Sequence, residues 1–207
     1  EHTGTIFVND KPIEIKSLSK QIERGFAWVP EDRQREGLVP TMSIGKNISL
    51  SNLKKYVCRG FLNERMENKS IDQMIQEVHI KASDKTLPIL SLSGGNQQKV
   101  VFAKGILTDP RILLLDEPSR GIDIGAKTEI FDIINKYAEQ GLTIIVISSE
   151  LNEIIAIADR IIVLSNGIKT AEFKGDEITE DNLVIASNQG HHGHNSKERE
   201  YSGHEIQ

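Results

Sequence analysis

Cysteine and long apolar runs are both scarce in this sequence of 207 residues. Cys58 is the single cysteine, so no disulfide can form within the chain, which fits a reducing compartment. The longest apolar runs have about four residues, whereas a helix that crosses a bilayer needs roughly 18. The first residues show neither Met nor a basic segment followed by an apolar one. We therefore expect no membrane span and no signal peptide, and the missing Met suggests a piece of a longer protein.

Positive charge is also in short supply, and this argues against nucleic acid as the main partner. Lys and Arg number 25 against 30 Asp and Glu, which gives a net charge of −5. Proteins that bind phosphate backbones usually carry a basic surplus. The remaining composition, 38% hydrophobic and 27% charged, is ordinary for a soluble globular protein whose length allows a sizeable core.

Apolar stretches alternate between strand-like and helix-like spacing along most of the chain. The expected strands are a hairpin over 4–15 and the segments 26–29, 112–115, 143–147, 161–164 and 168–173; the expected helices cover 66–78, 93–108, 130–137 and 152–158. Strands that alternate with helices predict an α/β fold with a largely parallel sheet covered by helices. The continuous apolar run 112–115 favours a strand buried on both faces.

Three further segments carry local expectations. Residues 31–37 are charged and end in Gly, which predicts a loop, and Trp28 is expected in the core because Trp is usually largely buried. From residue 187 onward the chain is polar and irregular, so we expect one domain over 1–186 and a disordered tail over 187–207. Its histidines 191, 192 and 194 are interpreted as solvated residues of that tail rather than a metal site.

The segment Leu92-Ser93-Gly94-Gly95-Asn96-Gln97 places a Ser and two glycines where a helix is expected to begin. A helix N-terminus offers free N–H groups and a partial positive charge, and glycines allow an anion to approach the backbone closely. Ser93 could donate to a phosphate oxygen. Taken alone, however, the segment is better explained as an N-cap that follows a Gly turn.

A second segment brings two carboxylates to the end of an apolar strand, in Ile112-Leu-Leu-Leu-Asp116-Glu117-Pro118. Ligands of parallel sheets gather at the carboxyl ends of the strands. Asp116 could hold Mg²⁺ through water, and Glu117 could orient or deprotonate an attacking water. An ordinary Asp-Glu turn after a strand is the alternative.

Together, the two segments resemble the signature and Walker B motifs of ATP-binding cassette (ABC) proteins. The likeness covers about residues 4–186, and it includes Gly121-Ile122-Asp123 at the position of the D-loop. The stretches 29–38, 93–99, 120–126 and 147–151 are similar to the second cassette of the ribose, galactose and xylose importers. The resemblance implies an ABC nucleotide-binding domain with a helical signature subdomain, here as its later part.

The resemblance also implies roles for particular residues. Asp116 would bind Mg²⁺, and Glu117 would be the catalytic carboxylate. The residues implied to contact ATP are Ser93, Gly94, Gly95, Asn96 and Gln97 of the signature, Glu31 at the Q-loop position and Asp123 of the D-loop. In the family the signature completes the ATP site of the opposing cassette, so these residues would act in trans.

Three departures from the family pattern point to a weakened site. The sequence contains no Gly-x-x-x-x-Gly-Lys-Ser/Thr, which is the phosphate-binding loop. Glu31 stands where the Q-loop usually has glutamine, and Ser149 stands at the position of the switch histidine. We therefore expect these residues by themselves to be inactive as an ATPase, and Glu117 to serve an impaired site.

The function implied by the resemblance is ATP hydrolysis coupled to sugar import. The expected cofactors are ATP and Mg²⁺. The expected partners are an opposing cassette in the same polypeptide, a membrane permease and, indirectly, a sugar-binding protein, at the cytoplasmic face of the membrane. Two alternatives stay open: a soluble ABC ATPase without a permease, and a regulatory half-cassette that does not catalyse.

Overall fold

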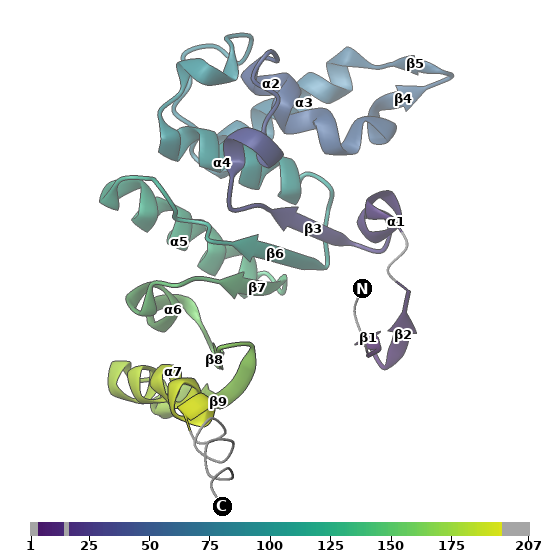
Figure 1. Ribbon diagram of the computed structural model, residues 1–207. Coiled ribbons are helices and arrows are strands. Elements are labelled where there is room, and N and C mark those ends of the chain that lie inside the picture. The colour runs from purple at the N-terminus through teal and green to yellow at the C-terminus, as the bar shows by residue number, and fades with distance from the viewer. Residues whose placement is uncertain (1–3, 15–16, 196–207) are drawn as a thin grey trace, which may run out of the picture. The chain divides into compact units, whose positions relative to one another are not determined.

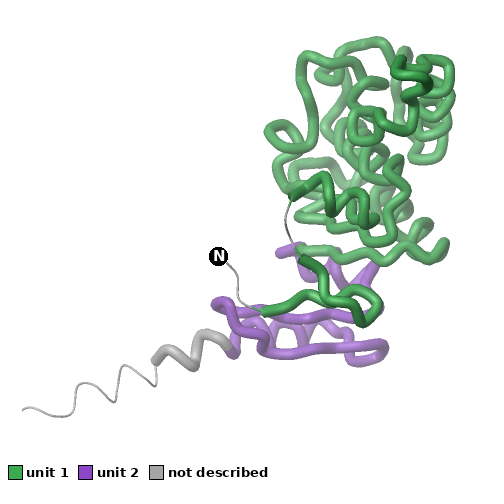
Figure 2. Tube along the Cα trace, turned by 90° about the vertical axis from the view of Figure 1, so that its right-hand side faces the viewer, with its two compact units in different colours: residues 1–147 green, residues 148–207 purple. Residues whose placement is uncertain are grey.

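The computed structural model describes residues 4–14 and 17–195, with side chains through residue 189. The chain divides into two compact units, residues 1–147 and 148–207 (Figure 2). The first unit contains a parallel sheet and the helices that connect its strands, and the second contains an antiparallel hairpin with its own helices.

The sheet of the first unit has three parallel strands (Figure 1). They are β3 (Phe26–Val29), β6 (Ile112–Asp116) and β7 (Thr143–Ile147), in the order β3-β6-β7. Trp28 lies beside Leu114, which lies beside Ile145. The predicted parallel sheet is confirmed.

Two helices lead into and out of β6. They are α4 (Gly94–Ile106) and α5 (Ile124–Glu139). The connection from β3 to β6 and the connection from β6 to β7 both lead to the next strand in the same direction across the sheet. Because such crossovers are right-handed, α4 and α5 lie on the same face. Helix α4 packs closely there, since a Cβ added at Gly105 would lie 3.6 Å from Leu113 and 3.7 Å from Ala27.

The opposite face of this sheet is open. Trp28 is 45% exposed, Ile145 51% and Ile147 60%, whereas Leu113 and Leu115 on the covered face are each 1% exposed. The expectation of a core Trp28 is therefore wrong, and so is the expectation that the run 112–115 is covered on both faces. The physical reason is that successive side chains of a strand point to opposite faces, and the described helices α4 and α5 cover a single one.

Between β3 and α4 the chain forms a mainly helical region that packs on α4. Its core contains Ile44, Ile48, Ile71 and Val78, all at most 2% exposed. Its elements are a π-helical turn η1 (Arg33–Gly37), α2 (Ile44–Ser49), the 3₁₀ helix η2 (Leu50–Tyr56), the strands β4 (Val57–Cys58) and β5 (Phe61–Leu62), α3 (Glu64–Glu77) and the 3₁₀ turn η3 (Ile89–Ser91). This region confirms the predicted helical subdomain around the signature helix.

The turn η1 differs from the loop expected over 31–37. Asp32 precedes it, and its carboxylate accepts hydrogen bonds from the backbone N–H groups of Gln34 and Arg35, each at 3.1 Å. This capping satisfies donors that would otherwise be open at the start of a helical turn.

Before β3, the hairpin strands β1 (Ile6–Val8) and β2 (Lys11–Ile13) are confirmed, and a short helix α1 (Leu18–Glu23) follows them.

The second unit is built around an antiparallel pair of strands. It comprises α6 (Leu151–Ile157), β8 (Arg160–Ser165), β9 (Ile168–Lys174), a 3₁₀ turn η4 (Gly175–Glu177) and α7 (Glu180–Asn195). The turn between the strands has positive φ at Asn166 and Gly167, the backbone conformation of a tight hairpin. Helix α7 packs on the hairpin and buries Leu183 and Ala186.

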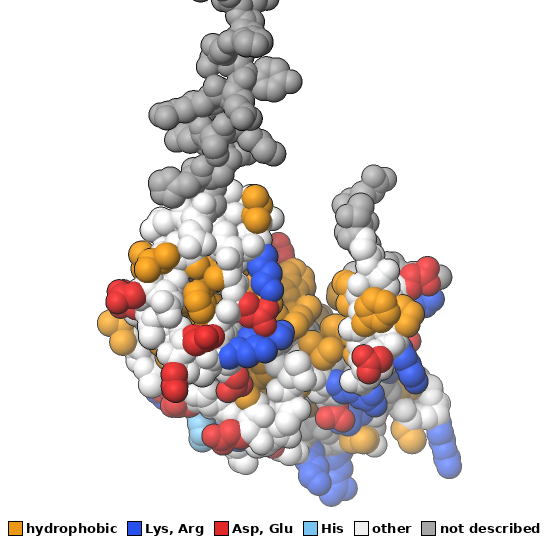
Figure 3. Space-filling view, turned by 90° about the horizontal axis from the view of Figure 1, so that it is seen from below, with side chains coloured by type: hydrophobic (Ala, Val, Ile, Leu, Met, Phe, Trp, Pro, Cys, Tyr) orange, Lys and Arg blue, Asp and Glu red, His pale blue; other side chains and the backbone are white. Residues whose placement is uncertain are grey.

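The surface seen in Figure 3 mixes apolar side chains with acidic and basic ones, without one large patch of a single kind.

Helix α7 continues to Asn195, past residue 187, where the irregular tail was expected to begin. Buried Ala186 and the hydrogen bond from Ser165 Oγ to the Ser187 carbonyl (2.6 Å) join the middle of α7 to the hairpin. Residues 196–207 and the side chains of the three histidines lie outside the described part of the chain.

We predict that the two faces of the sheet differ sharply in their contribution to stability. Leu115→Ala should lower the free energy of unfolding by about 2–5 kcal/mol, because it opens a cavity in a packed core. Ile145→Ala, at a side chain that is half exposed, should cost less than about 1 kcal/mol. Chemical denaturation of the two variants measures both values, and equal losses would contradict the open face.

Candidate functional site

Ser93 caps helix α4, as its position before the glycines predicted. Its φ and ψ of −61° and 158° are those of an N-cap, and its Oγ accepts hydrogen bonds from Asn96 N at 3.5 Å and from Asn96 Nδ2 at 3.0 Å. The Oδ1 of Asn96 in turn accepts from Lys81 N at 2.8 Å. The first turn of the helix is therefore held from outside as well as by its own cap.

The two glycines allow neighbouring segments to approach the start of α4. A Cβ added at Gly95 would overlap the Cβ of Ala126 at the start of α5. A Cβ added at Gly94 would lie 2.8 Å from Arg33 Nη2 and 3.5 Å from the carbonyl oxygen of Gly121. Both glycines therefore allow close packing at the start of α4. This role is compatible with anion binding at the same helix N-terminus.

Gln97 lies beneath this turn and not on its surface. It is 6% exposed, and its Nε2 donates to the carbonyl of Leu92 at 3.0 Å, which fixes the residue before the cap. The burial and this hydrogen bond indicate that Gln97 stabilises the turn that precedes α4.

Asp116 and Glu117 lie at the carboxyl end of the central strand, as predicted. Glu117 N donates to the carbonyl of Ile147 on the neighbouring strand at 2.8 Å. Its φ of 43° lies in the left-handed region, which costs a non-glycine residue free energy and tends to occur at functional sites. Among the described residues, no group of three His, Cys, Asp or Glu is placed so that it could hold a metal ion.

The loop after Glu117 reaches the start of α4. Asp123 caps α5, its Oδ1 accepting from Ala126 N at 3.0 Å. Between these residues, the carbonyls of Arg120 and Gly121 accept hydrogen bonds from Arg33 at 2.8 Å and 3.2 Å. The structure thus brings the signature, the end of β6 and the D-loop segment together within the first unit.

Glu31 and Ser149 have different surroundings. The carboxylate of Glu31 forms an ion pair with the guanidinium of Arg120. Ser149 belongs to the second unit and precedes α6; next to it, Ser148 Oγ donates to Glu153 Oε2 at 3.0 Å and accepts from Glu150 N at 3.1 Å. The side chain of Ser149 is exposed, and the hydrogen bonds of its neighbours order the turn into α6.

Two structural residues of this site were not singled out from the sequence, namely Arg33 and Lys99. Lys99 is 1% exposed; its Nζ donates to the His79 carbonyl at 2.9 Å and pairs with Glu129 of α5. In the sequence, Lys99 could have been identified by its place among the apolar positions of α4. Because buried charges are almost always paired, it predicts an acidic partner.

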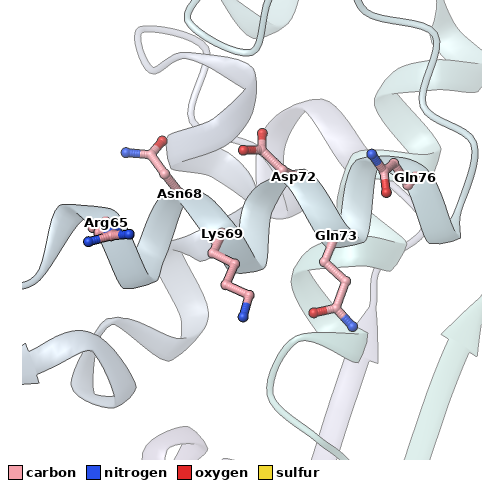
Figure 4. Close-up of a pocket in the computed structure, with 6 residues that line it drawn as sticks. All are labelled: Arg65, Asn68, Lys69, Asp72, Gln73 and Gln76. Carbon is pink, nitrogen blue, oxygen red and sulfur yellow. The ribbon is translucent and has the colours of Figure 1, made fainter.

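A polar hollow on α3 lies apart from these residues. It is lined by side chains of that helix alone: Arg65, Asn68, Lys69, Asp72, Gln73 and Gln76 (Figure 4). None of the motif residues lines it, so it adds nothing to the site. Within the described residues, no helix is long and apolar enough to cross a membrane.

Fold and site define a nucleotide-binding cassette. The structure is similar to the dimeric ATP-binding cassette MJ0796 in a post-hydrolysis state with ADP and phosphate, with a TM-score of 0.70 and 23% identity over 83% of this chain and 73% of that one. It is also similar to a nucleotide-free ATP-binding cassette from an ABC transporter, with a TM-score of 0.74 and 20% identity over 88% of this chain and 74% of that one. At these identities the likeness concerns the fold.

Sequence comparison gives the family. Residues 1–120 match the profile of the ABC transporter family, and the chain belongs to that family. It is 46% identical over 91% of its length to a putative ribose/galactose/methyl galactoside import ATP-binding protein of Rhizobium etli. It is 40% identical over 96% to the xylose import protein XylG of Pseudomonas fluorescens, and 45% over 88% to the ribose import protein RbsA of Clostridium tetani. The chain spans about a third of the length of these relatives (36%, 38% and 36%).

We predict that Gly95→Ala destabilises the first unit by about 1–3 kcal/mol, since the new methyl group forces α4 and α5 apart. Ala126→Gly removes the opposing methyl, so the double variant should recover most of the loss that Gly95→Ala causes. Urea unfolding of the two single variants and the double variant gives the interaction free energy. Additive losses would show that the two helices do not meet at these residues.

The Glu129 carboxylate predicts a pH dependence. Hydrogen bonds from Lys99 and Lys81 lower its pKa from 4.5 to about 2. A carboxylate with a lowered pKa stabilises the folded state above its unfolded pKa, and this contribution disappears as the pH falls from about 4.5 toward 2. Glu129→Gln should therefore be less stable than the unchanged protein at pH 7, with a difference that shrinks at pH 3.

Unfolding curves at the two pH values measure that difference. At neutral pH we expect about 1–3 kcal/mol, because buried Lys99 loses a charged partner. Glu139→Gln, near the end of the same helix, is the matched control. A difference that is the same at both pH values would contradict the role of the Lys99–Glu129 pair.

Proposed function

We propose that this chain forms part of the ATP-binding subunit of a sugar importer, and that its signature segment completes the ATP site of an opposing cassette. The observation that carries this proposal is the construction of the start of α4. The capped turn at Ser93 is braced by Arg33 and by α5, next to the loop that follows Asp116 and Glu117. A rigid helix N-terminus with glycines at its first two positions is well suited to a phosphate group.

The chain supplies only some of the groups that ATP hydrolysis requires. Proteins of this family bind ATP. The donors present here are the first N–H groups of α4, and the carboxylates are those of Asp116 and Glu117. A bound Mg²⁺ would supply positive charge for phosphoryl transfer. Asp116 would orient that ion through water, and Glu117 would orient the attacking water.

The two sets of residues would serve different ATP sites. Glu117 and Asp116 would act within their own cassette, whereas Ser93, Gly94 and Gly95 would face the opposing one. MJ0796, which has the same fold, is described as a dimer with ADP and phosphate, and this supports a paired arrangement. A second cassette in the same polypeptide fits a relative of which this chain spans 36%.

The transport role of the proposal rests on the relatives. Those with 40–46% identity are named as import ATP-binding proteins for ribose, galactose, methyl galactoside or xylose. We infer a membrane permease as the direct partner, a sugar-binding protein as the indirect one, and a position at the cytoplasmic face of the membrane. Glu31, paired with Arg120, and Ser149 at the switch position support a site that hydrolyses ATP less than its counterpart.

The test is Gly94→Asp in the complete two-cassette protein. A carboxylate at the first turn of a helix is favourable to the helix itself, yet it would occupy and repel the place of a phosphate. We therefore expect a loss of ATPase activity of about a hundredfold or more. Because any side chain at this position also displaces Arg33, the uncharged variant below gives the part of the loss that is due to packing. Gly94→Asn, of equal size and without charge, should retain more activity.

Glu117→Gln completes the comparison. Because Glu117 serves the weakened site, this change should cost much less activity than the matching Glu→Gln change in the other cassette. Steady-state phosphate release is the measurement. Full activity of a folded Gly94→Asp protein would show that α4 does not face nucleotide, and an equally severe loss in both Glu→Gln variants would show that both sites hydrolyse ATP.

A further inference from the structure

Two arginines link the loop after β3 to the loop after β6, one from each side. Arg33 donates from Nη1 to the carbonyl of Arg120 at 2.8 Å and from Nη2 to the carbonyl of Gly121 at 3.2 Å. In the other direction, the side chain of Arg120 pairs with the carboxylate of Glu31. Each loop thus supplies one guanidinium group and binds the guanidinium group of the other loop. We refer to these four residues, Glu31, Arg33, Arg120 and Gly121, as the arginine clamp.

The clamp is also fixed to helix α4. Arg33 Nη2 lies 2.8 Å from the position that a Cβ at Gly94 would take, so the guanidinium covers the first turn of the helix. The same turn η1 meets α4 further along, where Lys104 Nζ donates to the Gly37 carbonyl at 2.9 Å and a Cβ at Gly37 would lie 3.0 Å from Val101. Arg33 therefore has a defined position relative to both α4 and the loop after β6.

The chemistry of the contact requires a guanidinium. Its planar fork presents two N–H donors at a fixed spacing, which matches two successive carbonyls, whereas a lysine ammonium acts as a point charge. One of the two carbonyls belongs to Gly121, whose φ of 67° marks a sharp turn. The fork selects the loop conformation in which both carbonyls point to the same side.

We propose that Arg33 is a positioning residue that holds the loop of residues 117–123 against the start of α4, and that Glu31 supports this clamp through Arg120 and makes no direct contact with nucleotide. The inference rests on the proposed function. The loop begins at Glu117, which serves one ATP site, and the start of α4 serves the other. The clamp therefore couples the geometry of the two sites without touching ATP.

The first experiment compares Arg33→Lys and Arg33→Gln in the complete two-cassette protein, with Arg35→Gln as the matched control. Arg35 lies on the same turn, and its side chain is 87% exposed. Hydrogen–deuterium exchange should become about tenfold faster at the amides of 117–123 and 94–97 in Arg33→Gln, less so in Arg33→Lys, and stay unchanged in α3. The kcat should fall about 10- to 100-fold with little change in the KM for ATP, because misplaced groups slow the chemical step.

The second experiment exchanges the charges of the ion pair. Glu31→Arg and Arg120→Glu should each lower kcat, and the double variant should recover most of it, since the Arg120 backbone carbonyl stays available to Arg33. A direct contact of Glu31 with nucleotide or Mg²⁺ predicts no such recovery. A double variant as inactive as the single ones would overturn the part of Glu31 in the clamp.

The remaining outcomes separate this inference from the function on which it rests. Unchanged exchange in Arg33→Gln would overturn the clamp itself. Faster exchange with an unchanged kcat would overturn the positioning role. Gly94→Asp is measured in parallel: if it keeps full activity, the proposed role of α4 fails, while the exchange data still decide whether Arg33 orders the loop.

Discussion

The close approach of helix α4 to the loop after β6 is the contact on which the rest of the site depends. A helix that leads into a parallel strand runs antiparallel to it, so the start of α4 lies at the same edge of the sheet as the end of β6. The two can meet because Gly95 leaves room for Ala126 and Gly94 leaves room for Arg33. The signature and Walker B segments, about twenty residues apart in sequence, become neighbours through this packing.

Charged residues hold this contact, and their surroundings decide how much each one matters. Lys99 is buried between α4 and α5 and pairs with Glu129, while Arg33 spans the gap between two loops. Exposed pairs such as Lys54–Glu23, at 90% and 64% side-chain exposure, are screened by water and contribute little. Two contacts of the first unit, Lys99–Glu129 and the hydrogen bonds of Arg33, thus lie where its motifs converge. A further pair with a fully buried carboxylate, Lys46–Glu67, joins α2 to α3 in the helical region.

Much of the fold followed from local patterns. Apolar spacing placed β3, β6, β7, α3 and α4 correctly, and the segments expected as strands over 161–164 and 168–173 form the hairpin of the second unit. The errors in burial came where packing depended on distant segments. Trp28 lies on the open face of the sheet, and the run 112–115 is covered on one face only. The segment 31–37 forms a π-helical turn and not a loop, because Asp32 caps it locally.

The sequence by itself determined the type of the chain: the order of strands and helices, the N-cap at Ser93, the two carboxylates at the end of β6 and the likeness to ABC proteins. These features depend on residues near one another along the chain, where spacing and capping act. Only the tertiary structure decided that Gln97 is buried, that Glu31 pairs with Arg120 and that Arg33 binds the carbonyls of Arg120 and Gly121. Those contacts join residues 87–89 positions apart, and a guanidinium selects its acceptors by their arrangement in space, which no local pattern encodes.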